Sequence, residues 1–222
     1  MGSDYRPGQE STSFSQELSA LKREGSNLLV VGTDSIEAHR AACERLLGAD
    51  TPERRRLFVV IESDSVEGCR HVPVGTSEGI DRVIVRNLSG PPDVEQPAPL
   101  IHVDTRLLSV LGAEINVAVD EFDQAAQGLE PAELRLCFDS LGPLFAQHDS
   151  RTLFRLLHLV TARVRQASGM GHFHLRVGRE DDHVRLLEPL FDAVLELREG
   201  EDGPEQRFHI HDKNLERDWI EI

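Results

Sequence analysis

Short apolar runs alternate with segments of helical periodicity along most of this chain. The runs at 28–31 (LLVV), 57–61 (LFVVI) and 134–138 (LRLCF) are typical of buried strands, and residues 150–168 carry leucines and valines on one helical stripe. Strands that alternate with helices predict a largely parallel sheet with helices on both faces. Residues 192–199 read as a strand, and the segments that return after the hairpin-like stretch at 200–205 read as antiparallel strands at one edge. We therefore expect a single three-layer α/β domain.

Composition marks the ends and loops of this domain. Residues 1–13 are polar and lack the apolar stretch of a secretory signal, so we expect a disordered tail before a domain that spans residues 14–222. Prolines in segment 89–99 predict a surface loop. Gly112 is predicted to end a brief helix that Asp104 begins.

The helix after the first strand is marked at both ends. Asp34 can cap it, Glu37 completes a capping-box pattern, and Gly48 ends it. The side chains expected on its apolar face are Ile36, Cys43 and Leu47.

Charge excludes two classes of partner. The chain has 39 acidic and 24 basic residues, a net charge of −15, and Lys22 and Lys213 are its only lysines. This charge repels nucleic acid and anionic lipid, so neither is expected as a partner. No apolar run approaches the roughly 18 residues of a membrane span. Abundant carboxylates with scarce lysine favour a halophilic protein of a salt-rich cytoplasm, with an ordinary acidic mesophile as the alternative.

Cysteine spacing gives no disulfide framework. The chain has three cysteines, Cys43, Cys69 and Cys137, which lie far apart in the sequence and have no CxxC spacing. An odd number of cysteines without framework spacing is typical of a protein in a reducing cytosol. Cys137 lies in an apolar strand and is interpreted as core packing.

The order of the elements resembles the RecA/KaiC-type ATPase core. A strand ending in "VVG" precedes a helix, and "LRLCFDSL", a long helix, the strand "GHFHL" and "PLFDAVLELRE" follow much later. The resemblance implies that Asp139 matches the aspartate that holds the magnesium-bound water. It also implies that 171–175 is the strand between the two motif strands.

A narrower resemblance covers residues 14–222. The phrases "LEPAELRLCFDSLGPLF", "TARVRQASGMGHFHL" and "LLEPLFDAVLELRE" are similar to a family of uncharacterised haloarchaeal proteins, regarded as RecA-like domains without a working phosphate loop. This resemblance implies an archaeal, cytoplasmic origin and supplies no activity.

The phosphate-loop pattern G-x-x-x-x-G-K-[ST] is lost. Starting from Gly32, the second glycine is replaced by Glu37, the lysine by Ala38 and the hydroxyl residue by His39. The carboxylates of Asp34 and Glu37 would each oppose a phosphate by up to about 4 kcal/mol at ~4 Å and an effective dielectric near ~20. The turn after Gly32 is also expected to be too short to wrap a phosphate with backbone amides. We therefore expect a degenerate Walker A turn and no nucleotide cofactor.

What remains is interpreted as a vestigial pocket without catalytic residues. The turn Asp139–Ser140 favours a retained polar strand end, with a surviving metal or water ligand as the alternative. The residues assigned to this pocket are Gly32, Thr33, Asp34, Ser35, Asp139, Ser140 and His174.

Two H-x-H pairs are further metal candidates. His172 and His174 share one face of a strand, and His209 and His211 share one face of another. Together they could hold zinc, but each pair is interpreted as a packed histidine face, and no bound metal is expected. The weak candidates for metal ligands are Asp139, His172 and His174.

These observations favour a non-catalytic RecA/KaiC-like module, a pseudo-ATPase that serves in regulation or protein interaction. Its partner would be an unknown protein or a second copy of the chain. The alternative is a metal-dependent enzyme or a nucleotide sensor that uses a repurposed pocket around Asp139 and His174.

Overall fold

A computed structural model describes most of the chain. The described residues are 20–21, 23–32, 36–48, 54–62, 81–87, 100–103, 107–210, 215–216 and 218–222. The predicted tail (1–13), the predicted loop (89–99), Cys69 and the turn residues Thr33, Asp34 and Ser35 lie outside them.

The described strands form one sheet in the order β10-β8-β7-β1-β6-β5-β2-β3-β4, and β9 pairs with β8. Strands β1 to β7 are parallel to their neighbours among themselves, whereas β8, β9 and β10 pair antiparallel at one edge. The predicted fold class, a mostly parallel sheet with antiparallel C-terminal edge strands, is confirmed. The strands are β1 (Ser26–Val31), β2 (Arg55–Glu62), β3 (Asp81–Asn87), β4 (Leu100–His102), β5 (Leu134–Asp139), β6 (Met170–Leu175), β7 (Ala193–Glu199), β8 (Pro204–Ile210), β9 (Leu215–Glu216) and β10 (Ile220–Glu221).

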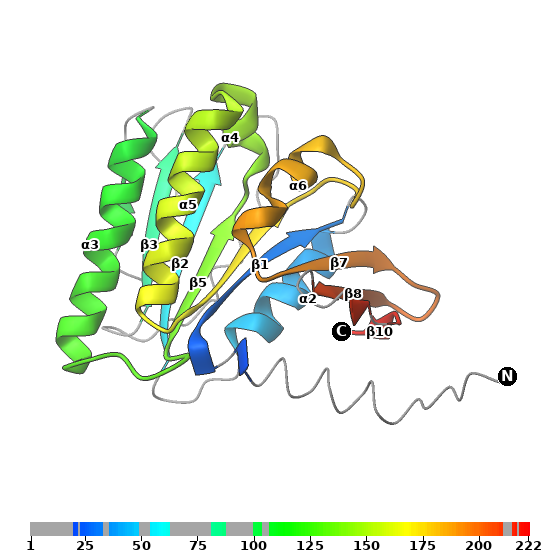
Figure 1. Ribbon diagram of the computed structural model, residues 1–222, viewed down its shortest axis with the longest axis horizontal. Helices are drawn as coiled ribbons and strands as arrows, with labels where there is room; N and C mark the ends of the chain where they lie inside the picture. Colours follow the sequence, from blue (N-terminus) through cyan, green and yellow to red (C-terminus); the bar gives the residue numbers. More distant parts are fainter. Residues whose placement is uncertain are drawn as a thin grey trace, which may run out of the picture.

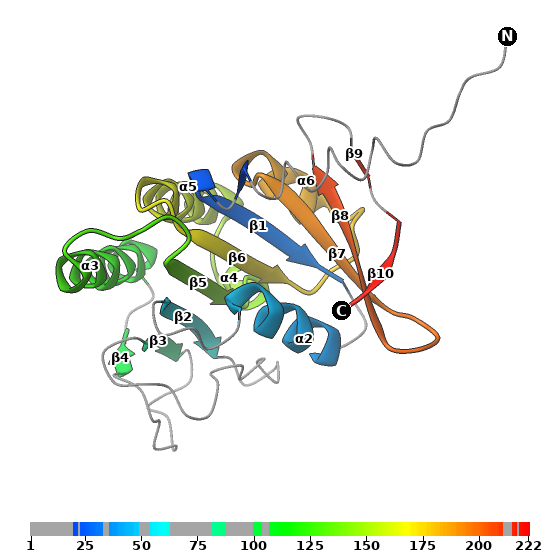
Figure 2. The same cartoon turned by 90° about the horizontal axis from the view of Figure 1, so that it is seen from below.

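Helices cover both faces of the sheet. In Figure 1, α3 and α5 run side by side over one face, and Figure 2 shows α2 on the opposite face. The helices are α2 (Ile36–Leu47), α3 (Leu108–Ala126), α4 (Gly142–Gln147), α5 (Ser150–Gln166), α6 (Asp182–Leu187) and the 3-10 helix η1 (Glu188–Leu190). None of the helices in the described part of the chain combines the length and apolar composition that a membrane span needs.

Strand β1 lies at the centre of the sheet and contributes to both faces. It pairs with β6 on one side and β7 on the other, and all its residues are buried. Leu29 and Val31 pack into the core under α3 and α5, whereas Val30 packs with Ala38 and Ala42 of α2. Successive side chains of a strand point to opposite faces, so one apolar run supports both helical layers.

The helix predicted over 150–168, expected to be the longest, corresponds to α5, but α3 is longer, with 19 residues against 17. The side chain of Asp149 caps α5 by accepting a hydrogen bond from the backbone N–H of Thr152 at 2.9 Å. Its buried stripe, as the periodicity predicts, includes Leu153, Leu157 and Val160. Strand β6, the segment "GHFHL", lies between β1 and β5, as the resemblance to the RecA/KaiC core implies.

Two local predictions are wrong. Gly112 does not end a helix but lies inside α3, where a Cβ atom would stand 3.1 Å from Cδ1 of Leu156 in α5. Glycine therefore allows α3 to approach α5 closely. Ile36 is not on the buried face of α2, because 47% of it is exposed at the start of the helix. The buried residues of α2 are Ala38, His39, Ala42, Cys43 and Leu47.

Candidate functional site

The predicted phosphate-loop turn is the connection between β1 and α2. Strand β1 ends at Val31 and α2 begins at Ile36, so residues 32–35 make the connection. Of these, Gly32 is described, and the roles predicted for Thr33, Asp34 and Ser35 stay predictions.

Gly32 is needed for packing within the sheet. Its φ of +153° is one that side chains rarely adopt, and a Cβ atom here would lie 2.7 Å from the carbonyl oxygen of Leu197 in β7. This close approach between β1 and β7 accounts for the glycine without a phosphate.

His39 occupies the space next to this turn. Its imidazole is 1% exposed, and Nε2 donates a hydrogen bond to the carbonyl oxygen of Gly32 at 3.1 Å. A neutral imidazole with its proton on Nε2 has a lone pair on Nδ1. That Nδ1 lies 2.9 Å from Nδ1 of His174, so with His39 neutral the N–H of His174 donates to it. The relay Gly32–His39–His174 leaves Nε2 of His174 without a proton.

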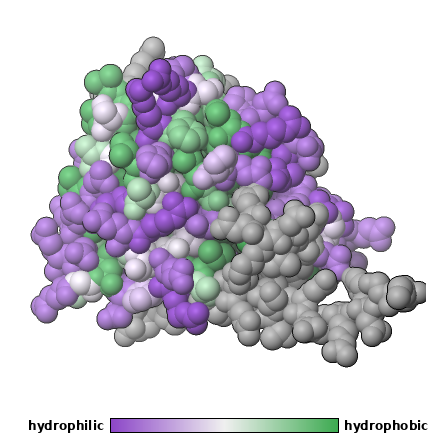
Figure 3. Space-filling model, viewed as in Figure 1, coloured by the Kyte–Doolittle hydropathy of each residue, from purple (hydrophilic) through white to green (hydrophobic). Residues whose placement is uncertain are grey.

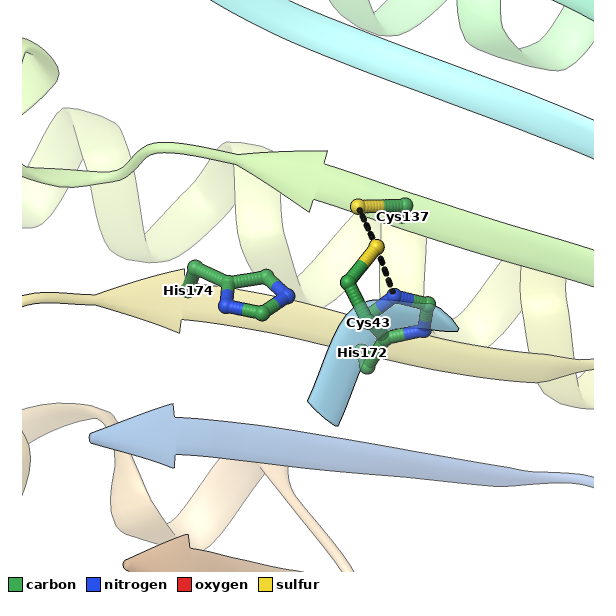
Figure 4. Close-up of side chains that lie close together, drawn as sticks. All are labelled: Cys43, Cys137, His172 and His174. Carbon is green, nitrogen blue, oxygen red and sulfur yellow. Dashed lines mark hydrogen bonds between the residues drawn. The ribbon is translucent and has the colours of Figure 1, made fainter. Parts of the chain in front are cut away.

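A cluster of two thiols and two imidazoles lies beside this relay (Figure 4). Sγ of Cys43 is 3.3 Å from Sγ of Cys137 and 3.3 Å from Nε2 of His172. The four ligand atoms, one each from Cys43, Cys137, His172 and His174, lie within 4.8 Å of one another. All four residues are buried, at 3% exposure or less. We call this group the Cys2His2 cluster.

The fold brings the four members together from three elements. His172 and His174 alternate along β6 and therefore share a face of the sheet, as predicted. Cys137 of β5 pairs in register with His172. Cys43 comes from the buried face of α2, which packs against β5, β6 and β7. Two neighbouring strands and the helix above them thus build the cluster.

Hydrogen bonds and charges in the cluster favour a thiolate on Cys43 and a neutral imidazole on His174. The hydrogen bond from Cys137 is the largest cause that lowers the pKa of Cys43 well below its ordinary value. The charge and hydrogen bond of His172 lower this pKa further, whereas burial raises it. Burial is also the largest cause that lowers the pKa of His174.

Asp139 lies on the same face of β5 as Cys137, at the carboxyl end of the strand. It is 3% exposed, and neither carboxylate oxygen has a hydrogen-bond partner among the described residues. Burial raises its pKa to about 7, which the nearby Arg176 opposes and Cys43 supports.

Ser140 serves the local turn. Its hydroxyl oxygen accepts a hydrogen bond from the backbone N–H of Gly142 at 3.4 Å, and the N–H of Leu141 donates to the carbonyl oxygen of His174 at 2.9 Å. These bonds fit the interpretation of a polar strand end that is tied to β6.

The second H-x-H pair does not join the first. His209 lies on β8, which β7 and β1 separate from β6. Its Nε2 is 2.9 Å from a carboxylate oxygen of Glu196, within a cross-strand polar pair. His211 lies outside the described residues. His209 therefore does not lie close enough to His172 and His174 to share a zinc ion with them.

The cysteines are the members of the cluster that the sequence did not assign to a site. The prediction that Cys137 is core packing is incomplete, because its sulfur also contacts the sulfur of Cys43. The available signal was the expected adjacency of β5 and β6, which sets Cys137 beside the first H-x-H pair. The buried face predicted for α2 already included Cys43.

Fold and site together define an α/β protein with a mostly parallel sheet and a buried Cys2His2 cluster under α2. The chain belongs to DUF7504, a family of unknown function, whose model matches residues 25–197. This range begins just before β1, ends within β7 and includes all four cluster residues. A search of curated proteins finds no match.

Proposed function

We propose that the protein is a non-catalytic RecA/KaiC-like module that has lost ATP binding and serves in regulation or protein interaction. The position of β6 between β1 and β5 supports the likeness to the RecA/KaiC core, in which the corresponding strand separates the two motif strands. An archaeal, halophilic and cytoplasmic setting remains part of this proposal and rests on the acidic composition and the resemblance.

One observation carries the loss of ATP binding. The positions that hold lysine and a hydroxyl residue in a phosphate loop hold Ala38 and His39, and both side chains are buried. Ala38 packs with Val30 and Leu195 of the sheet, and His39 bonds to the carbonyl of Gly32. Neither side chain offers a positive charge to a phosphate. The imidazole of His39 is instead held by its hydrogen bond to the carbonyl oxygen of Gly32 at the start of the turn.

A groove between α3 and α5 supports the interaction part of the proposal. It has a volume of about 340 Å³ and is lined mainly by apolar side chains, among them Leu108, Leu156 and Leu159. Leu159 is 62% exposed. Figure 3, drawn from the same side as Figure 1, shows hydrophobic side chains among hydrophilic ones on this face. Exposed apolar surface of this kind is typical of protein-binding sites.

Nucleotide titration tests the proposal. We expect no shift in melting temperature and no saturable heat of binding with millimolar Mg-ATP, at low and at molar KCl, and no ATP hydrolysis above the buffer rate. ADP and GTP serve as parallel ligands. Saturable ATP binding would contradict the loss of nucleotide binding.

The alternative function receives support from Asp139. A buried carboxylate without a partner is the type of group that a metal-dependent enzyme or a nucleotide sensor would use. The variant Asp139→Asn decides between the readings. If the wild type binds or hydrolyses nucleotide and this variant does not, the result would favour a repurposed pocket around Asp139 over a non-catalytic module that has lost nucleotide binding.

A further inference from the structure

The donor atoms of the Cys2His2 cluster match one class of metal ion. Two sulfurs and two imidazole nitrogens, with no oxygen among the four, are the ligands that zinc(II) and similar transition metals prefer. Magnesium and calcium require oxygen ligands. The composition of the cluster therefore favours zinc. Four protein ligands are also the number found in structural zinc sites, in which no coordination position is left open.

The spacing of the donors also fits. Bonds of about 2.3 Å to sulfur and ~2.0–2.1 Å to nitrogen in a tetrahedron place neighbouring donors roughly 3.3–3.8 Å apart. The Cys43–Cys137 and Cys43–His172 contacts are both 3.3 Å, and all four donors lie within 4.8 Å. The two 3.3 Å contacts would lengthen by a few tenths of an ångström to reach tetrahedral spacing, and donors as far as 4.8 Å apart would close by about 1 Å as the metal binds.

His174 provides an independent indication that a ligand belongs here. Its Nε2 is buried and has no hydrogen-bond partner among the described residues. The relay from Gly32 through His39 places the proton of His174 on Nδ1, so Nε2 carries a lone pair. Figure 4 shows a ring nitrogen of His174 directed toward Cys43. A metal-bound histidine typically donates its second nitrogen's proton to a neighbouring acceptor, and here the acceptor is His39.

We propose that Cys43, Cys137, His172 and His174 bind one zinc(II) ion that fastens α2 to strands β5 and β6. Two thiolates would neutralise the dication in this buried site, and the remaining thiol protons would pass to solvent as the metal binds. This site goes beyond the proposed function and does not depend on it.

Metal analysis of the wild type is the first test. The protein is purified under reducing conditions without an affinity tag, stripped with a chelator and given zinc(II) or cobalt(II). We expect close to one equivalent of zinc per chain. We also expect cobalt to give intense visible bands of a tetrahedral site together with thiolate-to-metal charge transfer.

Variants locate the site. Cys43→Ser, Cys137→Ser and His172→Ala should each lose the tetrahedral spectrum or bind cobalt at least tenfold more weakly. Cys69→Ser is the matched control, because it removes the third cysteine and leaves the four proposed ligands in place; its spectrum should equal that of the wild type.

The wild-type measurement decides the matter even if a variant fails to fold. Less than a tenth of an equivalent of zinc, with no charge-transfer band in folded, reduced protein, would overturn the proposal. A Cys43–Cys137 disulfide that takes up no metal after reduction would overturn it as well. Neither result bears on ATP binding, which the nucleotide titration measures separately.

Discussion

The two faces of the sheet are built from the same strands but differ in chemistry. On the face under α3 and α5, one continuous core joins side chains of the central strands to both helices. On the face under α2, the apolar residues form smaller clusters. The buried polar or thiol side chains of His39, Cys43, Cys137, His172 and His174 also lie on this second face, around the Cys2His2 cluster.

Adjacent residues of β5 display the difference most clearly. Phe138 points to the α5 face, where its ring stacks on Phe173 with centroids 5.7 Å apart. Cys137, one residue earlier, points to the α2 face and contacts Cys43. The strand thus separates a face stabilised by hydrocarbon packing from the face that carries the Cys2His2 cluster. The following experiments test that separation.

The largest effect is expected on the packed face. Phe138→Ala removes a fully buried ring and should lower the free energy of unfolding by about 3–5 kcal/mol. Urea unfolding at fixed salt measures this loss. Since the ring lies on the face opposite the cluster, the loss should be the same with and without zinc. A loss that appears only in zinc-loaded protein would contradict the separation of the faces.

Metal removal should act on the α2 face. A ligand that binds only the folded state adds about 2.7 kcal/mol of stability when its free concentration is ~100 times Kd. Chelation should therefore lower the unfolding free energy of the wild type by that amount relative to protein at such a zinc concentration. In Cys137→Ser, which should bind the metal at least tenfold more weakly, the effect of chelation should be smaller by about 1.4 kcal/mol or more. A chelator effect of wild-type size in Cys137→Ser would place the metal elsewhere.

Gly32→Ala tests the reason for the glycine at the start of the turn. The strained φ and the carbonyl of Leu197 at 2.7 Å from the new Cβ should cost roughly 1–3 kcal/mol of stability. Thermal unfolding with and without Mg-ATP provides the measurement, and the loss should be the same in both. Gly203→Ala is a matched control, because this glycine also has a positive φ but a Cβ there meets no atom within 4 Å. A smaller loss for Gly32→Ala than for Gly203→Ala would contradict the packing role.

The smallest effect on stability is expected at the groove between α3 and α5. Leu159→Glu changes an exposed side chain and should alter the unfolding free energy by less than about 0.5 kcal/mol. If the groove mediates self-association, light scattering at increasing concentration should show a lower mass for this variant than for the wild type. Arg151→Glu, an exposed position on the same helix, is the control for added charge. Equal masses for wild type and both variants would exclude self-association through the groove.

Much of the fold could be predicted from the sequence because apolar periodicity reports burial directly. The run at 28–31 marked a central strand correctly, and the apolar stripe over 150–168 marked the helix α5, although α3 and not α5 is the longest helix described. The predicted end at Gly112 failed because the same glycine that weakens an isolated helix allows close contact between two packed helices. That contact depends on the residue opposite, Leu156, which is distant in the sequence.

The candidate site was predicted only in part. The H-x-H spacing of His172 and His174 places both side chains on one face without any tertiary information. Cys43 and Cys137 are 94 positions apart, and their contact requires both the pairing of β5 with β6 and the docking of α2. His39 was noted only as a replacement in the phosphate-loop pattern. Its hydrogen bond to His174 depends on how α2 is rotated against the sheet.

Isothermal titration calorimetry of one sample of reduced, metal-free protein tests the central claim most directly. Zinc is titrated first and Mg-ATP second, at low and at molar KCl. The account predicts saturation at one zinc per chain and no saturable heat from Mg-ATP. Saturable binding of Mg-ATP with no uptake of zinc would contradict it.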